Sequence, residues 1–118
     1  MERKALPKYV LNMVYKYRWL DQALDDMTKE IDFVLREYGV NEARKVEEEI
    51  RKRVLQLCRF PFSGVEYEGL LFHGKEVRTI RMNRISIIYC FQNDIVTLVA
   101  IWNNYQNPDK LLVIVKER

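Results

Sequence analysis

Cysteine and histidine are scarce in this sequence, and their scarcity excludes several kinds of site. A single histidine, His73, rules out a pair of histidines for acid and base catalysis. The two cysteines, Cys58 and Cys90, show neither a Cys-x-x-Cys spacing nor a histidine close by in sequence, so no zinc site is indicated. A disulfide between them stays an alternative, but two structural thiols in a reducing compartment are the favoured interpretation.

Long apolar runs, glycine-rich loops and a strong excess of one charge are also missing. No stretch approaches the roughly 20 apolar residues of a membrane span, and the N-terminal "MERKALPKYVL" lacks the apolar core of a secretory signal. The net charge of +3 is too small by itself to indicate a nucleic-acid partner. No phosphate-binding loop, nucleophile elbow or paired-carboxylate motif is present. We therefore expect a cytoplasmic protein with no metal, no cofactor and no membrane partner.

The composition is that of one folded domain. The 118 residues are 48% hydrophobic and 31% charged, which suits a chain with a single core. We predict one domain over residues 1–118, with residues 1–7 and 112–118 as flexible or accessory ends.

The first half of the chain predicts a strand followed by two helices. Alternation of apolar residues over 8–17 suits a strand with one face on the core. Apolar spacings of three and four then predict a helix over 20–38, ended by a left-handed Gly39, and a second helix capped by Asn41. Glu30 counts among the solvent-facing residues of the first helix. The short loop between the helices predicts an antiparallel hairpin. The predicted apolar stripes are Leu20, Leu24, Met27, Ile31, Val34 and Tyr38 in the first helix, and Ala43, Val46, Ile50, Val54 and Leu57 in the second.

The second half predicts a meander of strands. Residues 65–76 are interpreted as a long connection, and strands are predicted over 76–82, 85–91 and 95–102, with links short enough to force antiparallel hairpins. The terminal "LLVIVKER" is either a short strand or a helical tail, because five apolar residues fit both. The predicted fold class is α+β, with an N-terminal strand, an antiparallel two-helix hairpin and a three-stranded antiparallel meander forming one sheet.

Positive charge is concentrated in the meander. Between Gly69 and Asn93 the sequence has four cations, against Glu76 alone; they are Lys75, Arg78, Arg81 and Arg84. Because the helices would cover one face of the sheet, we predict that the opposite face is basic and open. Contact of all four cations with phosphates would make binding of single-stranded RNA weaken with salt at a log-log slope of roughly −3.

A polar segment, "NNYQNP", follows the last predicted strand. Its amides, among them Asn104 and Gln106, are either turn formers or target contacts, since asparagine accepts left-handed backbone and bonds its own chain. Tyr105 is either a proton donor or base-stacking platform, or a turn residue that packs beside Pro108. Tyr89 is predicted to lie in the core or at its edge.

The stretch "GKEVRTIRMNRISIIYCFQNDIVTLVAIWNNYQNPDKL" resembles the C-terminal half of toxins in the RelE/ParE superfamily of type II toxin-antitoxin systems. It contains a glycine, an arginine-bearing strand, a hydrophobic strand that includes Ile-Ile-Tyr, and a last strand that leads into a polar turn. The resemblance extends from about Tyr9 to Leu111. It implies a toxin of the plasmid stabilisation type, neutralised by an antitoxin that covers the helical hairpin and a sheet edge. The implied target is either ribosome-bound mRNA or DNA gyrase.

Two positions depart from the ribonuclease pattern that the resemblance implies. Ser86 and Tyr105 stand where RelE-like enzymes tend to have arginines, so the sequence leaves open whether this chain is an endoribonuclease. The alternative is a degenerate, non-toxic family member that acts only as a protein-binding module. The candidate catalytic residues are Arg78, Arg81 and Tyr105, and the candidate target-binding residues are Lys75, Arg84, Asn104 and Gln106.

Overall fold

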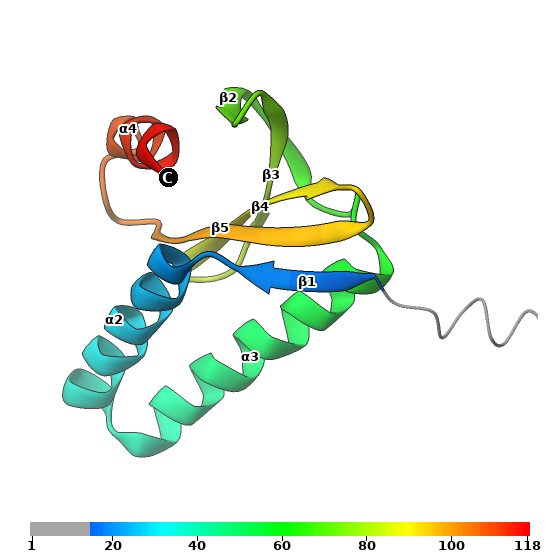
Figure 1. Cartoon of the computed structure of the whole chain (residues 1–118). Coiled ribbons are helices and arrows are strands. Elements are labelled where there is room, and N and C mark those ends of the chain that lie inside the picture. Colours follow the sequence, from blue (N-terminus) through cyan, green and yellow to red (C-terminus); the bar gives the residue numbers. More distant parts are fainter. Residues whose placement is uncertain (1–14) are drawn as a thin grey trace, which may run out of the picture.

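The computed structural model describes residues 15–118, which form one five-stranded sheet with helices on both faces (Figure 1). Most of the first predicted strand, residues 8–14, lies outside the described residues. The elements are β1 (Lys16–Trp19), α2 (Asp21–Tyr38), α3 (Val40–Arg59), β2 (Val65–Phe72), β3 (Lys75–Arg81), β4 (Ile85–Gln92), β5 (Ile95–Asn103) and α4 (Asp109–Glu117). The strand order is β1-β5-β4-β3-β2, in which β1 is parallel to β5 and the other neighbours are antiparallel. The predicted α+β class is confirmed.

Helices α2 and α3 form the predicted antiparallel hairpin, because their apolar stripes pack against each other and on the sheet. Gly39 adopts a φ of 94° between them, a conformation that glycine reaches without steric cost. The predicted cap at Asn41 is wrong: α3 begins at Val40 directly after Gly39, and no side chain among the described residues caps it. The stripe of α2 is also rotated slightly, since Leu24 and Tyr38 are exposed whereas Glu30 is buried.

The predicted connection over residues 65–76 is wrong, because most of it is strand β2. It pairs with β3 through a tight turn at His73 and Gly74, whose φ values of 51° and 77° fit a type I′ hairpin. His73 therefore lies at an exposed turn. The register between β2 and β3 shifts between Glu66 and Leu71, around a positive-φ Gly69. This irregularity interrupts the alternating pattern that identifies a strand in sequence.

The sheet has a hydrophobic core on each face, since β4 and β5 are apolar on both sides. On the helical-hairpin side, Met27, Ile50 and Leu57 pack against residues that include Ile87, Tyr89 and Leu98. The predicted basic and open face is wrong: the opposite side is apolar and α4 covers it (Figure 1). The C-terminal segment is thus a helix. The core beneath it contains Leu70, Phe72, Val77, Ile88, Cys90, Val99, Ala100, Trp102, Leu111 and Val115.

Candidate functional site

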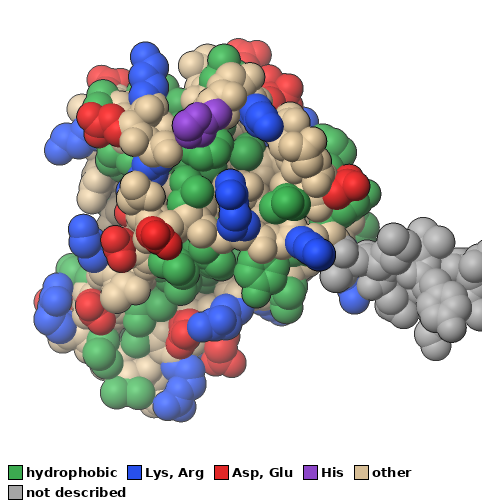
Figure 2. All heavy atoms as spheres, viewed as in Figure 1, with side chains coloured by type: hydrophobic (Ala, Val, Ile, Leu, Met, Phe, Trp, Pro, Cys, Tyr) green, Lys and Arg blue, Asp and Glu red, His purple; other side chains and the backbone are tan. Residues whose placement is uncertain are grey.

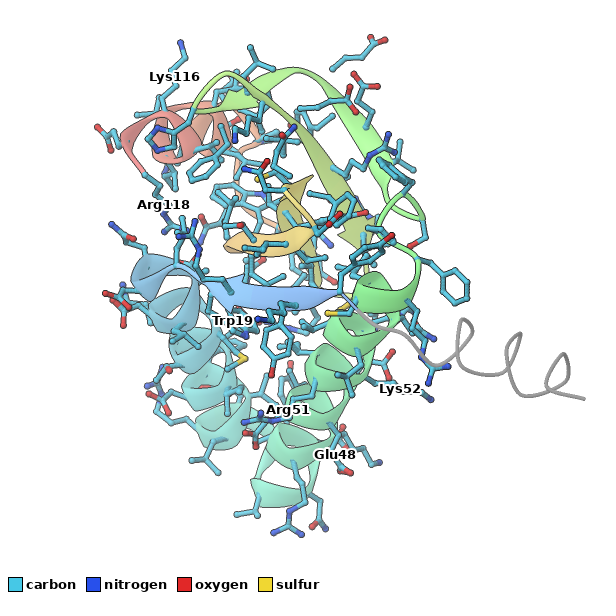
Figure 3. The ribbon with its side chains drawn as sticks, turned by 45° about the vertical axis from the view of Figure 1, so that its right-hand side comes forward. Trp19, Glu48, Arg51, Lys52, Lys116 and Arg118 are labelled. Carbon is cyan, nitrogen blue, oxygen red and sulfur yellow. The ribbon has the colours of Figure 1, made fainter. Side chains whose placement is uncertain are left out.

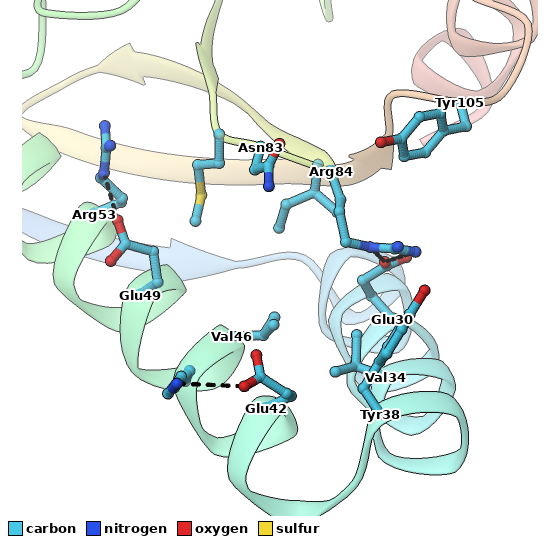
Figure 4. A pocket seen from close by; sticks show the side chains of 13 residues that line it. Glu30, Val34, Tyr38, Glu42, Val46, Glu49, Arg53, Asn83, Arg84 and Tyr105 are labelled. Carbon is cyan, nitrogen blue, oxygen red and sulfur yellow. Dashed lines mark hydrogen bonds and ion pairs between the residues drawn. The ribbon is translucent and has the colours of Figure 1, made fainter.

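A groove of about 740 Å³ lies between the helical hairpin and the turn that joins β3 to β4 (Figure 4). Its floor is apolar, and exposed tyrosines stand at two points on its margin, Tyr38 on α2 and Tyr105 after β5. Tyrosine, arginine and methionine are the residue types that protein interfaces favour. The groove is lined by Glu30, Val34, Tyr38, Glu42, Lys45, Val46, Glu49, Arg53, Met82, Asn83, Arg84, Ile85 and Tyr105.

Each cationic side chain of this groove is held by a carboxylate. Arg84 from the β3–β4 turn lies 3.1 Å from Glu30 of α2. On α3, Lys45 lies 3.3 Å from Glu42, and Arg53 lies 3.1 Å from Glu49. Three positive and three negative charges therefore cancel within the lining, which leaves no excess field for an anionic ligand.

Arg84 is the best-anchored cation of the groove. Glu30 is only 9% exposed. Its carboxylate accepts a hydrogen bond from the Arg84 guanidinium and another from the Nδ2 group of Asn103. The guanidinium also lies 4.9 Å from the ring centre of Phe33 and 5.8 Å from that of Tyr105, distances at which a cation is attracted to an aromatic face. Glu30 was missed at the sequence level, although it stands three residues after Met27 and four before Val34, on the buried side of α2.

The amides of the segment after β5 are used to build its turns. Asn103 Oδ1 accepts a hydrogen bond from the Tyr105 N–H at 2.8 Å, and Asn107 Oδ1 accepts one from the Asp109 N–H at 3.0 Å. The side chain of Asn104 accepts a hydrogen bond from Ser86 Oγ at 2.7 Å. The turn-forming interpretation is the one that these contacts favour. Tyr105 remains 76% exposed at the tip of this turn.

The other candidate residues do not join Arg84 and Tyr105. Arg78 turns toward the α3–β2 loop, where it donates to the Gly64 carbonyl at 2.8 Å and pairs with Glu76 at 3.2 Å. Arg81 has the strand parity of Val77 and so faces the α4 side, exposed and without an ion pair in the described part of the chain. Lys75 begins β3 at the far turn, and the exposed Gln106 borders a separate cavity between α2 and α4.

Positive charge is dispersed on the face of the molecule that Figure 2 shows. Figure 2 shows lysine and arginine side chains interspersed with acidic ones on the face in view. Of the four cations that the sequence concentrates in the meander, Arg78 and Arg84 are held internally.

The buried phenol of Tyr89 and the two buried thiols are unsuited to acid–base chemistry at neutral pH. Burial raises the pKa of Tyr89 above its usual value of 10.0 and raises the pKa of the Cys58 and Cys90 thiols. The Tyr89 hydroxyl is structural: it donates to the Pro61 carbonyl at 2.8 Å and accepts from the Gly64 N–H at 2.9 Å. Both thiols are buried and free. Across residues 15–118, no cluster of three or more His, Cys, Asp or Glu side chains could hold a metal ion.

Comparison with protein families gives a match over most of the folded chain. Residues 17–108 match the model described as the ParE toxin of the type II toxin-antitoxin system parDE. This chain belongs to the ParE toxin family. It is accordingly a toxin of the ParE/RelE type from a type II toxin-antitoxin system. Helix α4 begins at Asp109 and lies outside the matched region.

Solved structures share the fold of this ParE family member. The chromosomal ParDE system of P. aeruginosa superposes with a TM-score of 0.63 at 17% identity, covering 76% of this chain and 96% of the other. The RelBE2 toxin-antitoxin complex of Mycobacterium tuberculosis gives a TM-score of 0.53 at 15% identity, covering 78% and 100%. No curated protein matches this chain. Within residues 15–118, no helix has both the length and the apolar character needed to cross a membrane.

Proposed function

We propose that this protein arrests growth by binding a protein target, DNA gyrase, rather than by cleaving ribosome-bound mRNA. We further propose that it acts in the cytoplasm and is neutralised by a cognate antitoxin. The observation that carries the choice of target is the internal pairing of Arg84 with Glu30 and of Arg78 with Glu76 and the Gly64 carbonyl. Of the three meander arginines that could replace the missing ribonuclease arginines, these two are engaged, and Arg81, which lies opposite Ser86 in the β3–β4 ladder, is exposed.

Cleavage of RNA through its own 2′-hydroxyl needs a base, a donor for the leaving oxygen and cations around the phosphorane, each proton-transfer role contributing about 10²–10⁴ in rate. Here the side-chain oxygens of Asn103 and Asn107 accept from backbone N–H groups, and that of Asn104 accepts from Ser86. The buried phenol and thiols have raised pKa values. Such a surface is better suited to protein contact, which requires shape and composition but no proton transfer. An antitoxin is supported by the two structural neighbours, which are both toxin-antitoxin systems by their descriptions.

The test compares both targets with the same purified protein. We expect inhibition of gyrase supercoiling with accumulation of cleaved DNA, while mRNA on ribosomes stays intact. Expression without an antitoxin should stop growth and give filamentous cells with DNA breaks. Cut mRNA together with unaffected gyrase would overturn the proposed target. Normal growth with both targets unaffected would favour the non-toxic binding module.

The response of RNA binding to salt should be shallow. Only Lys75 and Arg81 of the four meander cations stay outside ion pairs within residues 15–118. At about −0.7 for each phosphate contact, the meander cations should contribute no more than about −1.4 to the log-log slope for single-stranded RNA. Fluorescence anisotropy with a labelled oligonucleotide between low and high salt measures it. A contribution of roughly −3, measured against a variant in which alanine replaces all four meander cations, would mean that Arg78 and Arg84 leave their partners to bind phosphate.

A further inference from the structure

The connection between α3 and β2, residues 60–64, presents two phenylalanine rings to solvent. Phe60 is 63% exposed and Phe62 is 65% exposed, and Val65 at the start of β2 is 71% exposed. Phenylalanine and valine are among the residue types most often buried in a folded protein. These three side chains are called the aromatic surface below. It lies beyond the C-terminal end of α3, outside the lining of the groove described above.

The backbone beneath these rings is fixed by a buried polar network. The Tyr89 hydroxyl donates to the Pro61 carbonyl at 2.8 Å and accepts from the Gly64 N–H at 2.9 Å. Arg78 donates to the Gly64 carbonyl at 2.8 Å, and its guanidinium lies 5.1 Å from the centre of the Phe62 ring. A Cβ atom on Gly64 would lie only 2.5 Å from the Tyr89 hydroxyl, so a larger residue would displace the network. The rings are therefore exposed on a loop that is held in place.

Further aromatic rings continue this surface across the end of the sheet. Phe62 meets Phe91 of β4 edge to face, with 5.4 Å between the ring centres, and Phe91 meets Tyr15 in the same way at 4.9 Å. The Tyr15 N–H donates to the Cys58 carbonyl of α3 at 2.9 Å. Figure 1 shows the α3–β2 connection, the start of β1 and the β4–β5 turn on the same side of the molecule. Three segments that are distant in sequence thus support the exposed rings.

Cations without ion pairs lie beside the aromatic surface. Lys52 and Arg59 are seven residues apart and so share one face of α3. Both are exposed, and neither has an ion pair within residues 15–118. Figure 3 shows Lys52 on α3, on the side away from α2. The exposed carboxylate of Glu66, next to Val65, lies opposite Arg78 in the β2–β3 ladder. The margin of the surface therefore has an excess of positive charge.

We propose that the aromatic surface docks this protein on gyrase, with its two phenylalanine rings in an apolar pocket of gyrase that has acidic residues at its rim. The proposal rests on the proposed function, which supplies gyrase as the target. Rings that project from a surface need a concave partner, and pockets are a feature of a folded protein rather than of an extended or helical antitoxin segment. Carboxylates at the pocket rim would complement Lys52 and Arg59.

The size of the aromatic surface fits a docking contact better than a permanent dimer. At about 200 Å² for each ring, the exposed fractions of Phe60 and Phe62 leave about 250 Å² of ring surface in solvent. That area suits the centre of an interface of about 800 Å² per partner, whereas obligate dimers bury more than about 1,000 Å² per partner. A second copy of this chain is a poorer occupant, since two-fold pairing sets the cations of α3 against cations.

Inhibition of DNA supercoiling by purified gyrase tests the docking site with the full-length protein. Phe60→Ala and Phe62→Ala should each raise the concentration for half-inhibition about tenfold, because a few buried aromatic anchors supply most of the binding energy of an interface. Leu71→Ala is the matched control: it truncates an apolar residue of β2 that is 56% exposed outside the aromatic surface, and should change inhibition less than about twofold. Urea denaturation followed by circular dichroism checks that the variants are folded. Unchanged inhibition by both phenylalanine variants would overturn the proposal.

Charge reversal on α3 keeps the test decisive if Phe62→Ala fails to fold, because it leaves the rings in place. Lys52→Glu and Arg59→Glu should each slow association with immobilised gyrase about tenfold at low salt and less at high salt, since charges at a margin act mainly on the association rate. Lys110→Glu makes the same change in net charge on α4 and should have a smaller effect. Surface plasmon resonance at two salt concentrations measures the rates. Equal rates for all three variants would overturn the proposed acidic rim.

Failure of the docking site and failure of the proposed function give different results. If the unsubstituted protein does not inhibit gyrase, the proposed function fails and the docking site fails with it. If it inhibits gyrase and both phenylalanine variants are equally potent, only the docking site fails. A dimer that dissociates on dilution and is lost in Phe60→Ala would make a second copy the occupant. Growth arrest by the phenylalanine variants that a co-expressed cognate antitoxin no longer relieves would make the antitoxin the occupant. Either result overturns the proposal.

Discussion

Glu30→Ala is expected to lower the free energy of unfolding by about 3 kcal/mol. The carboxylate is buried and accepts hydrogen bonds from Arg84 and from Asn103, and removal of one partner from a buried ion pair typically costs about 3–5 kcal/mol because the other charge is left without compensation. The lower end is expected, since Arg84 keeps some solvent contact and its aromatic neighbours Phe33 and Tyr105. Urea denaturation followed by circular dichroism measures the change.

A matched control distinguishes this buried pair from the exposed pairs of the same groove. Glu42→Ala removes the partner of Lys45 on the surface of α3, and we expect a change below about 0.5 kcal/mol, as for other exposed pairs. Arg84→Met added to Glu30→Ala should recover part of the lost stability, because the uncompensated charge is then gone. Equal effects of Glu30→Ala and Glu42→Ala would mean that Glu30 contributes no more than a surface residue.

The sequence contains the information for the elements more than for the groove. Helical spacing identifies α2 and α3, and short links identify the β3–β5 meander, because both signals are local. The groove depends on contacts between distant segments: Arg84 and Glu30 are 54 residues apart. Nothing in the local pattern of the β3–β4 turn indicates that its arginine points to α2. For the same reason, the sequence identifies a group of three neighbouring arginines, Arg78, Arg81 and Arg84. It does not predict that each of their side chains has different surroundings in the fold.

The second face of the sheet shows where the interpretation of charge went wrong. The residues from Val96 to Trp102 are buried without alternation, which is typical of a strand covered on both faces. That continuous apolar pattern is visible in the sequence, and it indicates that other elements cover both faces of the strand. The arginines of β3 drew the prediction toward an open basic face, although β3 is flanked by β2 and lies away from the centre of the sheet. The missing layer is supplied by α4, whose five apolar residues fit a strand or a helix equally well.

Leu111→Ala provides the strongest test of the role of α4 as the second layer. Leu111 is 2% exposed and packs with Val99, Ala100 and Trp102 under the helix, so its truncation should lower the free energy of unfolding by about 3 kcal/mol, the middle of the range for buried leucines. The neighbouring Leu112 is 38% exposed, and Leu112→Ala is therefore expected to cost below about 1 kcal/mol.

It matters which amides lose hydrogen-exchange protection in Leu111→Ala, as well as how much stability is lost. If α4 is part of the cooperative fold, amides of β5 should lose hydrogen-exchange protection together with those of α4, and the change in urea midpoint should match by all probes. Faster exchange confined to α4, with unchanged protection in β5, would instead mean that the helix docks on a sheet that is stable without it. The family match ends at Pro108, before α4. Loss of protection in β5 would therefore mean that the core needs α4 for its stability, and a change confined to α4 would mean that the matched region forms a stable core without it.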